Sequence, residues 1–88
     1  MMQYRKHGLL EEYLLLKTVD NKHLTRYKLR LELRTKGIST SISQFYQLIK
    51  YLIIKDYVKI DKDFTCVITD KGMKRIIELE RFIKESIL

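Results

Sequence analysis

The stretch SISQFYQLIKYLIIK, residues 41–55, decides how the chain folds. Its apolar residues are spaced by three, one, three and one positions, which is the spacing of one face of an α-helix. These residues are Phe45, Leu48, Ile49, Leu52 and Ile53. Ser41 or Ser43 supplies a side-chain oxygen that can cap the first turn. We therefore predict a helix over residues 41–55.

The segment before it, residues 25–36, is compatible with two kinds of structure. Apolar and charged residues alternate strictly from Tyr27 to Leu33, and a period of two is typical of a strand. However, Leu, Arg, Lys and Glu all favour helices, and none of them favours strands. Leu29 and Leu33 are also spaced as neighbours on one helix face, and Thr25 can cap the first turn. We therefore expect a helix over residues 25–36.

Two more segments have helical patterns. Leucines are dense in residues 8–19, which indicates a helix buried over much of its circumference. Residues 70–87 follow a capping residue, Thr69 or Asp70, and their apolar residues recur mainly at spacings of three and four. Both segments are therefore predicted to be helices.

Two short β-rich runs lie between the third and the last predicted helix. Tyr57–Ile60 and Phe64–Ile68 flank the polar turn Asp61–Asp63, which indicates a β-hairpin over residues 57–68. The residues expected to face the core from the second strand are Phe64, Cys66 and Ile68. The element order is helix, helix, helix, hairpin, helix, so the predicted fold class is α+β and mostly helical.

Length and composition limit the class of protein. The 88 residues are enough for one domain, 1–88, and 45% hydrophobic with 33% charged residues is ordinary for a folded chain rather than a disordered one. No apolar run approaches the roughly 20 residues that a membrane span needs, and no signal peptide is visible. We therefore expect a single cytoplasmic domain without a membrane partner.

The positive charge is concentrated in one segment. The chain has 18 Lys and Arg against 11 Asp and Glu, a net charge of +7. Residues 1–21 and 60–88 are each neutral, whereas residues 22–59 hold nine basic and two acidic residues, so 9 − 2 = +7 comes from the middle alone. A basic segment of this kind is typical of a protein that binds a polyanion.

Few residues are suited to catalysis or metal binding. Cys66 is the only cysteine, so an internal disulfide and a cysteine metal cluster are ruled out. A buried core thiol is favoured over a bridge between two chains. His7 and His23 belong to no nucleophile or metal-ligand pattern, and no glycine-rich phosphate loop occurs. We expect no enzyme activity, no metal, no cofactor and no small-molecule ligand.

Three short motifs occur together in the second half of the chain. They are Phe45-Tyr46 with Ile49 and Leu52, then Asp56-Tyr57-Val58, and finally Ile68-Thr69-Asp70-Lys71-Gly72. Together they resemble the winged helix-turn-helix regulators of the PadR-like and MarR-like families, over about residues 9–85. The resemblance implies that 41–55 is the recognition helix and that the hairpin is the wing. Asp56 stands where these families usually have glycine, which leaves the tightness of that turn open.

The winged-helix resemblance implies double-stranded DNA as the partner. A helix fits the major groove, and glutamine is suited to two hydrogen bonds with adenine. The residues expected to contact DNA are Ser41, Ser43, Gln44, Tyr46, Gln47 and Lys50 of the third helix, Arg26, Lys28, Arg30 and Lys36 of the second, and Lys59 and Lys62 of the hairpin. The hairpin tip, Asp61-Lys62-Asp63, has a net charge of −1, so contact by the wing is left open.

The terminal helices carry more apolar residues than a small core can bury, which suggests a homodimer. The residues expected at its interface are Leu9, Leu10, Leu16, Ile76, Leu79, Phe82, Ile83 and Ile87. The competing hypothesis is that both helices close a monomeric core. We expect a sequence-specific transcriptional regulator, a repressor, that binds a palindromic site as a homodimer. A centromere-type DNA-binding protein in plasmid segregation and a winged-helix protein-interaction module are the alternatives.

Overall fold

The computed structural model describes residues 8–38 and 41–87, with side chains up to residue 85. Ser39 and Thr40, in the expected turn before the third helix, lie outside the described residues. The elements are α1 (Leu9–Asn21), α2 (Arg26–Thr35), α3 (Ile42–Ile54), β1 (Val58–Ile60), β2 (Cys66–Ile68) and α4 (Asp70–Ile87). β1 and β2 form an antiparallel hairpin. The predicted order of helix, helix, helix, hairpin, helix is confirmed.

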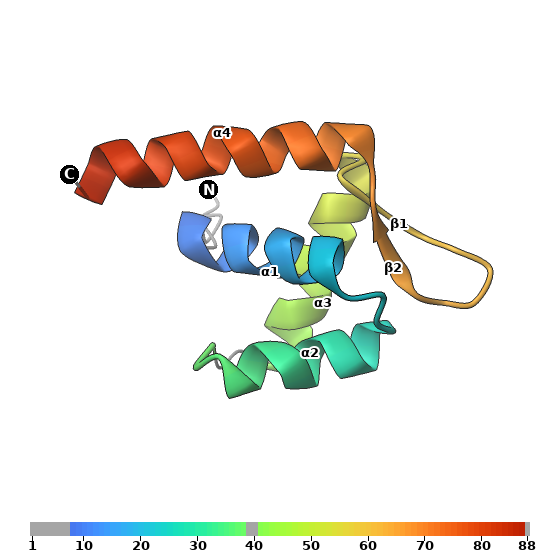
Figure 1. The fold of residues 1–88 in the computed structure, drawn as a ribbon. Coiled ribbons are helices and arrows are strands. Elements are labelled where there is room, and N and C mark those ends of the chain that lie inside the picture. Colours follow the sequence, from blue (N-terminus) through green and yellow to red (C-terminus); the bar gives the residue numbers. More distant parts are fainter. Residues whose placement is uncertain (1–7, 39–40, 88) are drawn as a thin grey trace, which may run out of the picture.

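α1 is the central element of the fold. It runs antiparallel to α4 along one side, although the two helices are far apart in the sequence (Figure 1). α2 lies on the other side of α1, and α3 passes behind it (Figure 1). The hairpin projects from the end of the molecule where α3 finishes and α4 begins. Because α1 also contacts β2, it joins the hairpin to the helices.

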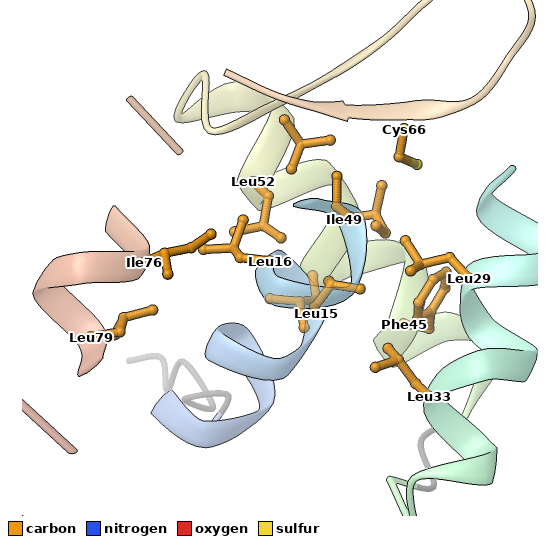
Figure 2. Packing of buried hydrophobic residues seen from close by; sticks show 13 residues of the cluster. Leu15, Leu16, Leu29, Leu33, Phe45, Ile49, Leu52, Cys66, Ile76 and Leu79 are labelled. Atoms are coloured by element: carbon orange, nitrogen blue, oxygen red, sulfur yellow. The ribbon is translucent and has the colours of Figure 1, made fainter. Parts of the chain in front are cut away.

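Side chains from every helix meet in one core, shown in Figure 2. Leu15 and Leu16 of α1 point into its middle and are fully buried. The other buried members are Val19 of α1, Leu29 and Leu33 of α2, Phe45, Leu48, Ile49 and Leu52 of α3, Val58 and Cys66 of the hairpin, and Ile76 and Leu79 of α4. The apolar stripe of α3 therefore faces this shared core, and the opposite side of α3 faces out.

α2 is a helix, as predicted, despite the alternating sequence. Thr25 caps it, because its Oγ1 accepts a backbone N–H of the first turn at 3.3 Å. Leu29 and Leu33 are buried, whereas Tyr27 is 63% exposed and Leu31 is 38% exposed. Burial thus follows the helical spacing of four and not the spacing of two, since only one face of the helix meets the core.

α2 and α3 end in the same kind of turn. After α2, Gly37 adopts a φ of 86°, and its N–H donates to the carbonyl oxygen of Arg34 at 3.0 Å. After α3, Asp56 takes the equivalent position with a φ of 65°, and the N–H of Tyr57 donates to the carbonyl oxygen of Leu52 at 2.9 Å. Asp56 therefore forms the tight left-handed turn that is usually built on glycine, which Asp tolerates better than most residues.

Thr69 and Gly72 join the hairpin to α4. The hydroxyl of Thr69 accepts the N–H of Gly72 at 2.9 Å and donates to the carbonyl oxygen of Asp56 at 2.5 Å. A Cβ on Gly72 would collide with the carbonyl oxygen of Tyr57 and with the side chain of Ile68. Glycine at 72 therefore lets the first turn of α4 approach the backbone that follows α3.

Polar side chains also link α1 to α4. The guanidinium of Arg75 donates to Glu12 through Nε at 2.8 Å and through Nη2 at 3.2 Å, and it donates to Glu78 at 2.6 Å. The carboxylate of Glu12 raises the pKa of Arg75 further, so its charge is permanent. Tyr13, the residue after Glu12, donates its hydroxyl to Glu80 of α4 at 2.8 Å. These bonds align the two helices over their shared length.

Candidate nucleic-acid interface

The outward side of α3 carries polar residues in a row opposite the core. Ser43, Gln47 and Lys50 are all exposed. Phe45, Leu48, Ile49 and Leu52, on the other side, hold the helix against the core. The exposed row therefore sits on a rigid support, and a ligand that approaches this side meets amide, hydroxyl and ammonium groups.

Ser41 and Gln44 are partly occupied by the cap of α3. The N–H of Gln44 donates to the hydroxyl of Ser41 at 3.1 Å, and the side-chain oxygen of Gln44 accepts the N–H of Ser41 at 3.4 Å. This reciprocal pair is a capping box and identifies Ser41, rather than Ser43, as the N-cap. The NH₂ group of Gln44 keeps its donors for another partner, whereas Gln47 takes no part in the cap.

Tyr46 connects α3 to α2. The guanidinium of Arg26 lies over the Tyr46 ring, 6.0 Å from its centroid. The edge of the ring meets Phe45 at a centroid distance of 5.2 Å. Tyr46 is 37% exposed, so it bridges the core and the outward surface. Through this contact the first basic residue of α2 is brought beside the exposed row of α3.

The basic residues of α2 separate into two rows on either side of its buried stripe. Arg26 and Arg30 are one helical step of four apart and share the side next to α3. Lys28 and Lys36 share the other side with Glu32. The Nζ of Lys36 donates to the hydroxyl of Thr18 on α1 at 3.0 Å. Lys28 and Lys36, which were expected to contact DNA together with the arginines, therefore lie on a different side of α2 from Arg26 and Arg30.

Glu32, which lies on the same side of α2 as Lys28 and Lys36, forms an ion pair. It pairs with Lys22 at 2.7 Å, and this hydrogen bond lowers the pKa of Glu32. The pair joins the turn after α1 to α2 and neutralises part of the positive charge there. The basic surface next to α3 is thus formed by arginines rather than by all the cations of the segment.

The wing carries its two lysines on the outside. Lys59 on β1 and Lys62 at the tip are both exposed. The carboxylate of Asp61 is turned inward, where it accepts the N–H groups of Asp63 at 2.9 Å and Thr65 at 3.1 Å, and the Thr65 hydroxyl at 2.9 Å. The bonds from Thr65, above all that of its hydroxyl, lower the pKa of Asp61. The tip is therefore a tight, internally bonded turn.

The wing is fastened to the start of α2. Thr65 pairs with Thr25 in an isolated antiparallel bridge, and the N–H of Cys66 donates to the carbonyl oxygen of Leu24 at 2.8 Å. Since Arg26 directly follows Thr25 and covers Tyr46, the wing, α2 and α3 form one continuous surface. This link was not evident from the sequence, because no local pattern indicates which strand pairs with residues 24 and 25.

Phe64 corrects one expectation from the sequence. It was expected to face the core with Cys66 and Ile68, but it is 71% exposed. The reason is its φ of 63°, which places it in the left-handed region and ends the alternation of the strand before β2 begins. Cys66 and Ile68 keep the expected direction, since Cys66 is buried and Ile68 packs against the core.

Cys66 is a core thiol, as favoured from the sequence. It is 1% exposed, and burial raises its pKa. A bridge to a second chain would require the strand to leave the core.

The expected interface between subunits is only partly available. Leu16, Ile76 and Leu79 are buried within the subunit, at 0%, 3% and 1% exposure, because α1 and α4 pack against each other and use these residues to do so. This corrects their assignment to a surface between subunits. Leu9, Leu10 and Phe82 are exposed at 37%, 56% and 50%, and Ile83 is half-buried. The side chain of Ile87 lies outside the described residues.

The described residues contain no cluster of three His, Cys, Asp or Glu side chains that could hold a metal ion. None of the helices that the structure describes is long and apolar enough to cross a membrane. The features that stand out are therefore the exposed row of α3, the arginines beside it and the wing.

Comparison with known proteins agrees with this geometry. No family model and no curated protein sequence matches the chain. Among solved structures, the chain is similar to F93 from STIV, a winged-helix DNA-binding protein. The match has a TM-score of 0.72 and 30% sequence identity, and it covers 90% of this chain and 92% of F93. With the predicted fold confirmed and nearly the full length of both chains aligned, the chain belongs to the winged-helix family.

Proposed function

We propose that the chain binds double-stranded DNA in a sequence-specific way, with α3 in the major groove. The observation that carries this proposal is the exposed row Ser43, Gln47 and Lys50 on α3. Arg26 of α2 lies beside this row, because its guanidinium contacts the ring of Tyr46. The likeness to a winged-helix DNA-binding protein supports it. So does the net charge of +7, all of which arises between residues 22 and 59.

Each side chain of the row has a proposed role. Gln47 reads a base, since its amide can form two hydrogen bonds with N6 and N7 of adenine. Ser43, Tyr46 and Lys50 contact phosphates, and Gln44 offers the NH₂ donors that its capping bond leaves over. The donors to the flanking backbone are Arg26, Arg30, Lys59 and Lys62. Three further proposed contacts lie at the margin of this surface. They are Lys28 and Lys36, on the other side of α2, and Ser41, in the cap of α3.

The base-reading role is tested with a cognate site selected from a random duplex library. Gln47→Ala should weaken binding to that site by about 1–3 kcal/mol and relax the preference at one base position. Lys50→Ala should weaken cognate and random duplexes alike. The matched control is Lys74→Ala, which removes an exposed lysine of α4. If Gln47→Ala weakens cognate and random DNA equally, Gln47 does not read a base.

The phosphate contacts are tested by salt. Log affinity should fall linearly with log salt concentration, with a slope of about −0.9 for each phosphate contacted. Arg26→Ala and Lys62→Ala should each make the slope less steep by about one unit if each contacts one phosphate. An affinity for DNA that does not change up to physiological salt would reject DNA as the partner. A pull-down would then test for a protein partner.

We further propose that two subunits bind a palindromic site, with half-sites about one helical turn apart. One domain reads few base pairs, and a second copy would supply the remaining specificity. After the correction above, the proposed interface consists of Leu9, Leu10, Phe82 and Ile83, with Ile87 at its end. Light scattering should give twice the subunit mass of 10.7 kDa, and Leu10→Asp with Phe82→Asp should return it to one. A mass of one subunit in the unchanged protein, with and without DNA, would refute the dimer.

The regulatory role belongs to the same proposal. Within the winged-helix family we assign the chain to the PadR-like and MarR-like type, acting in the cytoplasm as a repressor that occludes a promoter, without catalysis. A reporter placed behind the selected site should fall in expression when the protein is present. If instead the protein leaves expression unchanged but stabilises a plasmid carrying the site, it is a centromere-type segregation protein.

A further inference from the structure

The tip of the wing is a three-residue loop with an unusual residue at its last position. The loop Lys62–Phe64 is closed by the N–H of Asp61 donating to the carbonyl oxygen of Thr65 at 3.0 Å. Within it, the N–H of Phe64 donates to the carbonyl oxygen of Asp61 at 2.9 Å. Loops of this kind end in a residue with left-handed backbone, a position that favours glycine. Here that residue is Phe64, with a φ of 63°.

Folding does not explain a phenylalanine at this position. A left-handed backbone is unfavourable for a bulky side chain. Burial does not compensate, because Phe64 is 71% exposed and does not pack against the core. The chain thus keeps a large aromatic side chain in water, on a backbone that glycine would adopt more readily. A strained, exposed residue of this type points to a role in binding.

The surroundings hold Phe64 in place. Three hydrogen bonds to the carboxylate of Asp61, from Asp63 and Thr65, fix the turn on which Phe64 stands. The next residue, Thr65, pairs with Thr25. The backbone that carries Phe64 is therefore held by the turn and by the bridge to Thr25, the residue that precedes Arg26.

We propose that Phe64 is an apolar wedge that enters the minor groove beside the segment read by α3 and partly unstacks one base step. This inference rests on the proposed function. Lys62 is the single cation of the tip Asp61-Lys62-Asp63, whose net charge is −1, so the ring of Phe64 has to supply most of the contact made by the tip. Apolar side chains inserted between base pairs kink duplexes by about 20–90° in other minor-groove complexes. The wing would thus contribute shape recognition, whereas α3 reads bases.

The test uses a mixed-sequence duplex of about 30 base pairs at low salt, with a donor and an acceptor dye at its two ends. Unchanged protein should bind this duplex and shorten its end-to-end distance. Phe64→Gly should bind about 5- to 30-fold more weakly and leave the duplex straight. Its salt slope should equal that of the unchanged protein, because an apolar contact displaces no counterions. Phe64→Trp should retain binding and bending.

A stability measurement separates a binding role from a structural one. Because Phe64→Gly relieves the left-handed backbone, its Tm should rise by about 2–6 °C while its affinity falls. Ile77→Ala, which truncates a 56% exposed apolar residue on α4, is the control and should leave binding and bending unchanged. A fall in Tm for Phe64→Gly would overturn the wedge in favour of a packing role.

The outcomes also separate this inference from the proposed function. If unchanged protein binds and bends the duplex and Phe64→Gly does so equally well, the wedge is wrong and DNA binding stands. If unchanged protein binds without bending, the wedge is also wrong. If unchanged protein does not bind duplex DNA even at low salt, the proposed function fails and the wedge fails with it.

Discussion

Replacing Arg75 by methionine should lower the free energy of unfolding by about 3 kcal/mol. The side chain of Glu12 is 6% exposed, and its two oxygens accept N–H groups of Arg75 at 2.8 and 3.2 Å. Without Arg75 this carboxylate would remain buried without its partner, which typically costs about 3–5 kcal/mol. Because the side chain of Arg75 is itself 20% exposed, water can reach part of the vacated site, so we take the lower end.

The assay is urea unfolding followed by circular dichroism, with thermal unfolding in parallel. For a domain of this size the predicted loss corresponds to a Tm lower by about 12–24 °C. The double variant Glu12→Leu with Arg75→Met removes both charges and leaves an apolar contact between α1 and α4. It should recover most of the loss, because no unpaired charge remains in the interior.

Lys74→Met is the matched control, since it removes a cation from an exposed position of α4. It should change the free energy of unfolding by no more than about 0.5 kcal/mol. Two results would refute the reasoning. One is an equal effect of Arg75→Met and Lys74→Met. The other is a double variant whose loss equals the sum of the Glu12→Leu and Arg75→Met losses.

Three further predictions concern the fold. Gly72→Ala should destabilise the domain by at least about 2 kcal/mol, since its methyl group would meet backbone, and an unchanged Tm would contradict the close approach of α4. Leu16→Ala should lower the free energy of unfolding, measured in urea, by about 2–5 kcal/mol. Leu10→Ala should lower it by less than about 0.5 kcal/mol in a monomer. Equal losses would contradict the burial of Leu16 and the exposure of Leu10. The pKa of Asp61, followed by its carboxyl NMR signal, should lie below that of an ordinary aspartate, because Thr65 and Asp63 donate hydrogen bonds to its carboxylate. Because folding lowers this pKa, the contribution of Asp61 to the wing is present above its unfolded pKa and is lost as pH falls through the folded value. A pKa that is not lower than in the unfolded chain would show that the bonds from Thr65 are absent in solution.

The elements and their order could be predicted from the sequence, because the signals for them are local. The apolar stripe of residues 41–55 is decided by spacing within one helix, and Thr25 and Gly37 mark the ends of α2 by backbone chemistry alone. The concentration of positive charge in residues 22–59 is likewise a property of composition. These features need no knowledge of which segments meet in space.

Which side of each element is buried and which is exposed follows only from the packing of the elements. Leu10 and Leu16 lie on the same leucine-rich helix, yet only Leu16 is buried, because α4 covers one side of α1. Arg26 and Lys36 belong to the same basic segment, yet Arg26 meets Tyr46 while Lys36 meets Thr18. Local periodicity identifies an apolar or charged face, but contacts between residues distant in the sequence select its partner.

In the wing, the difference between the prediction from local sequence and the folded structure concerns a single residue, Phe64. The sequence indicated a hairpin with three turn residues, but the alternation of the strand placed Phe64 toward the core. In the structure the three hydrogen bonds to Asp61 close the turn one residue later, so Phe64 takes the left-handed position and points outward. The hydrogen bonds of the loop and the bridge between Thr65 and Thr25 together set the register of the turn and the pairing of the strands. The spacing of apolar residues along the sequence does not report the free energy of these hydrogen bonds.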